Sequence, residues 1–147
     1  LKYYYGIRGE VLRACLVRPR LTLCDLCGTQ AVFLLESAAV LRTLNLADIC
    51  RRLAEVLFYG EGIRLHFAAV SGDNALSVRS LLPDGSELAA CGEGAAAAAY
   101  TARAAGLSDS DRIPVRMRGG SFCAELYGTE ISLCAKSEVI FAGEINY

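Results

Sequence analysis

The sequence lacks any run of basic residues and any long apolar stretch. Its 147 residues carry a formal net charge of −1, and lysine and arginine are not gathered into the kind of stripe that binds nucleic acid. The longest apolar runs, such as residues 95–100, are too short and too rich in alanine to span a bilayer. The first ten residues, LKYYYGIRGE, are not typical of a signal peptide. We therefore expect neither a nucleic-acid partner nor a membrane partner.

Histidine is nearly absent, since His66 is the only one in the chain. Cys24 and Cys27 have the C-x-x-C spacing of zinc and redox sites, but a structural zinc needs a second pair of ligands at short spacing. Cys123 and Cys134 are far apart in the sequence and do not form such a pair. The sequence therefore predicts no metal site.

Cysteine itself is abundant, with seven residues, an odd number. Most of them lie in apolar surroundings, as in RACLV and ISLCA. This usage is typical of reduced, buried thiols rather than of a disulfide framework, so we expect the protein to be cytoplasmic. Hydrophobic residues make up 54% of the chain, which is enough for the core of one domain spanning residues 1–147.

Short β-rich segments separated by turns predict strands along most of the chain. The expected strands cover residues 10–17, 20–26, 30–36, 63–70, 75–82, 113–118, 121–128, 130–135 and 138–145. A helix is predicted over residues 46–58, because apolar residues recur there at helical spacing. Asn45 suits the N-cap of this helix and Gly60 suits its end.

Residues 95–105 are nearly all alanine and predict a second helix, which ends at Gly106. A helix that is apolar on every side is usually buried, and its small side chains allow strands to approach closely. The expected fold class is α+β. A curled, mostly antiparallel sheet wraps around the alanine-rich helix, and the amphipathic helix over 46–58 is added to it.

Cys91 lies just before the alanine-rich helix, in the stretch ACGEG. A helix N-terminus has unpaired amides and a partial positive charge, which favour a thiolate and can hold an anion. Gly92 and Gly94 have no side chain that would block a ligand. We therefore expect an open Cys91 sulfur beside vacant amides, able to act as a general base next to a bound carboxylate. A small buried filler is the alternative interpretation of such a cysteine.

The stretch ELAACGEGAAAAAYTARAAGL resembles the second active-site motif of diaminopimelate epimerases. The segment RIPVRMRGGSFCAELYGTEISLCAKSEVIFAGEI is similar to the tail of that family. Upstream, CGTQAVFLLES is similar to its G-N-P-H-A-V segment, and LADICRRLAEVLFYGEGIRLHFAAV to the helix and strand that follow. The resemblance covers nearly the whole chain and is strongest from Glu87 onward.

The resemblance implies an amino-acid epimerase or racemase, an isomerase of the kind that serves lysine biosynthesis. Such enzymes have two similar halves, each a curled sheet around a helix that begins at a cysteine. One thiol removes the α-proton and the other returns one, without pyridoxal phosphate or metal, so no cofactor is expected. By this resemblance, Cys91 would be one of the two thiols, the amides of residues 92–94 would bind the α-carboxylate, and Glu87 matches a glutamate of the motif.

The sequence departs from the family at several substrate-contacting positions. Glu93 stands where the family has Ser or Thr, so its carboxylate could fill the anion site or repel a substrate carboxylate. The family's Glu-Arg pair falls at Leu82 and Pro83, which cannot replace it. The other expected contacts fall at Thr29, Arg64 and His66. A lone strand histidine is otherwise usually packed or exposed.

The chain resembles the C-terminal domain of the family, and the N-terminal catalytic half has no counterpart in it. Three accounts follow. The chain is one half of a larger or two-chain enzyme, or it forms a homodimer whose two Cys91 thiols face each other. In the third account it is an inactive relative of the same fold that binds a small molecule or a protein. The consecutive Tyr3, Tyr4 and Tyr5 suit an edge strand or an interface, and the terminal FAGEINY is expected to leave a strand edge unpaired, which favours dimerisation or aggregation.

Overall fold

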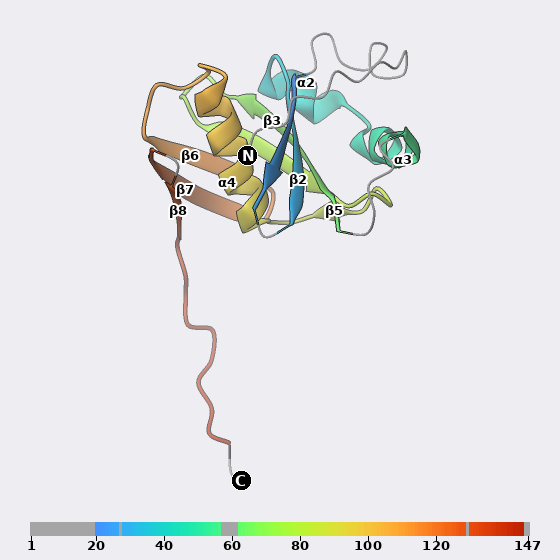
Figure 1. Cartoon of the computed structure of the whole chain (residues 1–147). Coiled ribbons are helices and arrows are strands. Elements are labelled where there is room, and N and C mark those ends of the chain that lie inside the picture. The colour runs from blue at the N-terminus through green and yellow to red at the C-terminus, as the bar shows by residue number, and fades with distance from the viewer. Residues whose placement is uncertain (1–19, 27, 57–61, 129, 146–147) are drawn as a thin grey trace.

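A computed structural model describes residues 20–26, 28–56, 62–128 and 130–145 of the chain (Figure 1). The expected strand over 10–17, the three N-terminal tyrosines, Cys27 and Gly60 lie outside the described residues. Within the described ranges, the chain folds into one sheet with helices on both of its faces.

The sheet has eight strands in the described part of the chain. In spatial order they are β1 (Arg20–Asp25), β2 (Thr29–Leu34), β3 (Arg64–Val70), β4 (Leu76–Leu81), β6 (Arg112–Met117), β7 (Gly120–Tyr127) and β8 (Glu130–Ala135), and β5 (Glu87–Leu88) pairs with β4. The pairs β2–β3 and β4–β6 are parallel, and the others are antiparallel. The sheet is therefore mixed and mostly antiparallel, as the sequence predicts.

Three helices are described: α2 (Ala38–Thr43), α3 (Leu46–Val56) and α4 (Gly92–Ala104). Helix α3 confirms the amphipathic helix, and Asn45 Oδ1 accepts a hydrogen bond from the Asp48 amide at 3.4 Å, as an N-cap does. Sequence reasoning missed α2, which Ser37 caps by accepting a hydrogen bond from the Val40 amide. Six residues are too few to show a helical period.

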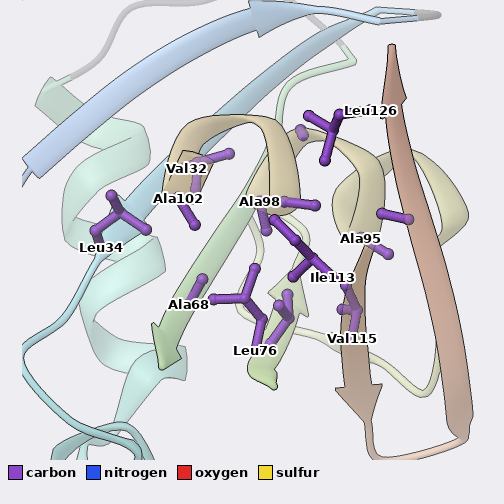
Figure 2. Packing of buried hydrophobic residues seen from close by; sticks show 14 residues of the cluster. Val32, Leu34, Ala68, Leu76, Ala95, Ala98, Ala102, Ile113, Val115 and Leu126 are labelled. Atoms are coloured by element: carbon purple, nitrogen blue, oxygen red, sulfur yellow. The ribbon is translucent and has the colours of Figure 1, made fainter. Parts of the chain in front are cut away.

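Helix α4 lies on the concave side of the sheet, between β2 and the strands β6 to β8 (Figure 1). Its alanines are buried: Ala95, Ala98 and Ala102 are 0% exposed. Figure 2 shows these methyl groups beside apolar side chains from strands on either side of the helix. The expected central, alanine-rich helix is confirmed, and its small side chains let the curled sheet close around it.

The opposite face of strands β2 to β4 is covered by α2 and α3. Phe33 and Phe67 are neighbours on β2 and β3, and their rings stack there with centroids 4.9 Å apart. The central strands are thus buried on both faces. This explains why AVFLL and HFAAV are continuous apolar runs rather than alternating patterns.

The expected final strand over residues 138–145 is wrong. This segment has no regular secondary structure and extends away from the body of the protein (Figure 1). Its large apolar side chains are 82–94% exposed: Val139, Ile140, Phe141 and Ile145. β-Propensity alone does not make a strand, because a strand also needs a neighbour with which to pair. Among the described helices, none has the length and apolar character needed to cross a membrane.

Candidate functional site

The concave face of the sheet is polar at the end where α4 begins. Side chains alternate along a strand, so Arg64 and His66 of β3 share the face that carries Ala68 of the α4 core. Gln30 of β2 is the register neighbour of Arg64, and Ser80 of β4 is the neighbour of His66. A polar group of side chains therefore lies next to the first turn of α4.

Cys91 is the N-cap of α4, as the sequence predicts for the start of the alanine-rich helix, although α4 begins at Gly92 rather than at 95. Its sulfur accepts a hydrogen bond from the Gly94 amide at 3.4 Å. The turn before it is held by the β6–β7 hairpin. The Gly119 amide donates to the Ala89 carbonyl oxygen at 2.7 Å, and the Cys91 amide donates to Met117 Sδ at 3.4 Å.

The expectation of an open sulfur is wrong, because Cys91 is only 6% exposed. Two charged side chains lie against the sulfur: Arg64 Nη1 at 3.9 Å and Glu93 Oε2 at 3.6 Å. These two side chains form an ion pair with an N–O distance of 3.3 Å and are themselves 35% and 40% exposed. The sulfur is therefore covered by half-exposed polar groups rather than by a closed apolar core.

Glu93 occupies the anion site of the helix N-terminus. Its pKa is lowered, mainly by a hydrogen bond from its own backbone amide and then by Arg64. The Gly94 amide is also used, since it donates to Cys91 Sγ. The expected vacant amides are thus already engaged at residues 93 and 94. Of the two possibilities that the sequence leaves open for Glu93, the structure shows the one in which its carboxylate fills the site.

His66 is fully buried beneath this turn, and its two ring nitrogens are both engaged. Nδ1 lies 2.8 Å from Ser80 Oγ, and Nε2 lies 2.7 Å from Gln30 Oε1. The pKa of His66 is lowered to about 4, mainly by burial and then by the nearby charge of Arg64. Gln30 continues this network to the backbone, since its Nε2 donates to the Leu26 and Gly28 carbonyl oxygens.

The two glycines of the motif serve different purposes. A Cβ on Gly94 would lie 2.4 Å from His66 Nδ1 and 2.9 Å from Ser80 Oγ, so the absence of a side chain there is needed for packing. A Cβ on Gly92 would meet Leu133 Cδ2 at 3.4 Å, an ordinary contact. The expectation that Gly94 leaves room for a ligand is therefore corrected: it leaves room for the histidine ring.

Glu87 lies away from the Cys91 sulfur, on the face of the sheet that carries α2 and α3. Arg79 Nε and Nη2 donate to its two carboxylate oxygens at 2.9 and 2.8 Å, which lowers the pKa of Glu87. Arg79 Nη1 also donates to the carbonyl oxygens of Leu41 and Leu44. The pair thus attaches α2 to the sheet.

Thr29 is exposed at the start of β2, and alternation directs its side chain away from the face that carries Gln30. The structure therefore brings together Cys91, Arg64, Glu93 and His66 of the residues predicted for the site, with Gly92 and Gly94, and leaves Thr29 and Glu87 apart from them. Sequence reasoning missed Gln30 and Ser80. The signal was their position: each is the one polar residue on a strand face whose other side chains are apolar.

The arrangement can bind a carboxylate next to a thiol. Arg64 and the amide of Glu93 itself already hold the carboxylate of Glu93, with its Oε2 3.6 Å from the Cys91 sulfur. The pKa of Arg64 is raised, first by the charge of Cys91 and then by Glu93. In the described ranges, no three His, Cys, Asp or Glu side chains are grouped so that they could hold a metal ion.

Two solved structures share this fold over most of the chain. A phenazine biosynthesis protein of the PhzF family from Enterococcus faecalis matches with a TM-score of 0.54 and 15% identity, and covers 69% of this chain and 35% of its own. A phenazine biosynthesis PhzC/PhzF protein from Clostridium difficile strain 630 matches with a TM-score of 0.52 and 20% identity, over the same shares. This chain thus spans 35% of the length of either structure.

No family model and no curated protein matches the sequence. PhzF-family structures have the fold of diaminopimelate epimerases, so the resemblance seen in the sequence is confirmed for the fold. The architecture is half of that fold, a curled mixed sheet around one helix. At 15% and 20% identity, the likeness establishes the fold alone.

Proposed function

We propose that this chain is one half of a cofactor-independent isomerase that moves a proton at the α-carbon of an amino acid, with Cys91 as an acid/base group. One observation carries the proposal. The carboxylate of Glu93 rests on the helix N-terminus and on Arg64, with its Oε2 3.6 Å from the Cys91 sulfur. A substrate carboxylate bound by the same groups would hold its α-carbon next to that sulfur.

The proposed step begins when a substrate carboxylate displaces Glu93. When the Glu93 side chain moves away from the helix N-terminus, it also uncovers the Cys91 sulfur. With Glu93 in place, Cys91 is only 6% exposed. The Cys91 thiolate then takes the α-proton. The electron pair left on the α-carbon is delocalised into the carboxylate, where the helix amides and Arg64 stabilise the added negative charge.

Inversion at the α-carbon needs a second acid on its opposite side. This chain supplies Cys91 on one side only, and it spans 35% of the length of its structural neighbours. We therefore propose that a second half, or a second copy of the chain, supplies the other acid. Alone, the chain would exchange the α-proton with solvent but would not invert the centre.

Proton exchange tests this proposal directly. The protein is incubated with a panel of amino acids in heavy water, and deuterium at the α-carbon is measured by NMR. We expect exchange by the wild type, faster exchange by Glu93→Thr, and none by Cys91→Ser. Cys50→Ser is the matched control. Burial raises the pKa of Cys50 to about 12, and Cys50 lies in the core on the opposite face of the sheet, which α2 and α3 cover. Absence of exchange in both the wild type and Glu93→Thr would refute the catalytic role.

A binding protein without catalysis is the second candidate, and the position of Glu93 favours it. A side chain that fills the anion site and covers the thiol is an obstacle to substrate. Under this alternative, Glu93→Thr would gain affinity for small carboxylates, measured by calorimetry, and would show no deuterium exchange. The exchange assay therefore separates the two candidates. Faster deuterium exchange by Glu93→Thr supports the isomerase, whereas tighter binding without exchange supports the binding protein.

A further inference from the structure

Cys123 and Cys134 lie directly opposite each other on the consecutive antiparallel strands β7 and β8. Phe122 and Ala124 of β7 and Leu133 of β8 belong to the core around α4, so alternation places both cysteines on the outer face. Directly opposed residues of antiparallel strands have Cα atoms about 4.5–5.5 Å apart. Disulfides span Cα separations of about 4.4–6.8 Å, so the register places these two thiols within bridging range.

The two thiols differ in access to solvent. Both are free thiols, and Cys134 is exposed while Cys123 is half-buried. A dissolved molecule therefore meets Cys134 first. Cys123 lies one strand further into the sheet, between Cys134 and Pro114 of β6. This is the arrangement of an attacking thiol with a second thiol held ready behind it.

A guanidinium lies beside the pair. Arg112 of β6 is on the same outer face, and its pKa is raised, mainly by a side-chain hydrogen bond with Cys123 and then by the charge of Glu125. Arg112 Nε also pairs with Glu125 Oε1 at 3.0 Å, which holds the guanidinium over β7. The guanidinium of Arg112 therefore lies beside the half-buried sulfur of the pair.

We propose that Cys123 and Cys134 form a site of reversible disulfide formation by exchange with small-molecule disulfides. The Cys134 thiolate attacks one sulfur of the dissolved disulfide, forms a mixed disulfide and releases the first small thiolate. The Cys123 thiolate then attacks the Cys134 sulfur, closes the cross-strand disulfide and releases the second. The small disulfide is reduced by two electrons to two thiols, and the protein dithiol is oxidised by the same two electrons. The protons of the two cysteines pass to the released thiolates.

The oxidised site would fasten β8 to β7. In the described sheet, β8 is the edge strand, and it ends one residue after Cys134. Leu133, on the inner face, lies beside the start of α4, since a Cβ on Gly92 would be 3.4 Å from its Cδ2. The disulfide would therefore hold the strand that flanks the Cys91 turn. The inference does not depend on the proposed function, since neither cysteine contacts the Cys91 sulfur.

Peptide mapping of the full chain is the test. Trypsin releases residues 119–136 as one peptide, GGSFCAELYGTEISLCAK, which contains these two cysteines and none of the other five. The folded protein is equilibrated with reduced and oxidised glutathione, quenched with acid, alkylated and digested. We expect the mass of this peptide to be lower by two hydrogens than that of the reduced peptide, and neither of its cysteines to be alkylated. Cleavage after Glu125 and Glu130 should then leave its two ends joined.

Variants separate the two chemical steps. Cys123→Ser should accumulate glutathione on Cys134, because the second step is removed. Arg112→Gln should slow ring closure several-fold, whereas the matched Arg116→Gln, on the same strand and face but paired with Asp73, should not. Two results would overturn the inference: glutathione that stays on Cys134 in the wild type, or a peptide 119–136 that keeps both free thiols in oxidised glutathione.

Discussion

His66 Nδ1 lies where a side chain at position 94 would begin: a Cβ on Gly94 would be 2.4 Å from that nitrogen. The first turn of α4 and the middle of β3 fit together only because residue 94 has no side chain. The ring cannot easily move away, since Ser80 and Gln30 hold its two nitrogens at 2.8 and 2.7 Å. The helix start that positions Cys91 thus depends on a buried polar network beneath it.

Gly94→Ala should therefore destabilise the protein although alanine favours helices. Overpacking of this kind costs roughly 1–3 kcal/mol, and the gain in helix propensity offsets up to about 1 kcal/mol. Gly92→Ala is the matched control, because its Cβ would meet only Leu133 Cδ2 at 3.4 Å, and it should be neutral or slightly stabilising. Urea denaturation measures both. Equal stability of the two variants would contradict the role assigned to Gly94.

Stability should decrease as the pH falls from 6.5 to 4. The pKa of His66 is about 4 in the folded protein and 6.5 ordinarily, so in this range the unfolded chain binds a proton that the folded protein does not. The stabilisation is fully present above pH 6.5 and is lost as the pH falls toward 4, by up to about 3 kcal/mol. Urea denaturation at a series of pH values measures it.

The control for this pH dependence is His66→Asn, which removes the titrating group and should flatten the curve between pH 6.5 and 4.5. Carboxyl groups with a lowered pKa, such as Glu87, affect stability only at lower pH. Their contribution to stability is lost only below pH 4.5, the ordinary pKa of a glutamate. If the wild type and His66→Asn have the same slope in the upper range, His66 is not the group responsible.

Glu87→Gln should destabilise the protein by about 2 kcal/mol, because it leaves Arg79 without its charged partner at a site where both side chains are mostly buried. Asp48→Asn is the matched control: its pair with Arg51 is more than half exposed, and its loss should cost less than about 0.5 kcal/mol. Thermal unfolding compares the two. A stable Glu87→Gln protein with weakened amino-acid binding would instead support the substrate contact expected from the sequence.

Removal of residues 138–147 should abolish self-association and leave the thermal stability of the fold unchanged. The segment exposes Val139, Ile140, Phe141 and Ile145 almost fully and makes no strand pair. We expect the full chain to associate with increasing concentration, because exposed apolar segments bury themselves against a partner. Analytical ultracentrifugation measures this. Ile140→Lys with Phe141→Lys, at full length, should have the effect of the deletion, and a full chain that stays monomeric at all concentrations would refute the prediction.

Periodicity and composition predicted the architecture because the core follows them. The alanine run of residues 95–105 could only be a buried helix, and Asn45 marked the start of α3. Two errors of prediction have related causes: helix α2 was missed, and residues 138–145 were wrongly predicted to be a strand. Six residues are too short to show a period, and a β-rich segment becomes a strand only when a neighbouring strand lies beside it.

The site was predicted in part. The capping position of Cys91 and the nearness of Arg64 followed from the motif, but the exposure of the sulfur did not, because it depends on where Glu93 places its carboxylate. Side-chain partners on adjacent strands were also missed. Arg79 meets Glu87, and Cys123 lies opposite Cys134, only because of the strand register, which depends on turn geometry that the sequence analysis did not assign.

The enclosure of α4 has a consequence for synthesis of the protein. The helix packs against β2, which precedes it in the chain, and against β7 and β8, which follow it. A nascent chain that ends after residue 105 would display a nearly pure alanine helix with half of its walls missing. The domain can therefore complete its interior only after β7 and β8 have been synthesised, and until then this helix is an exposed apolar surface that a chaperone can bind.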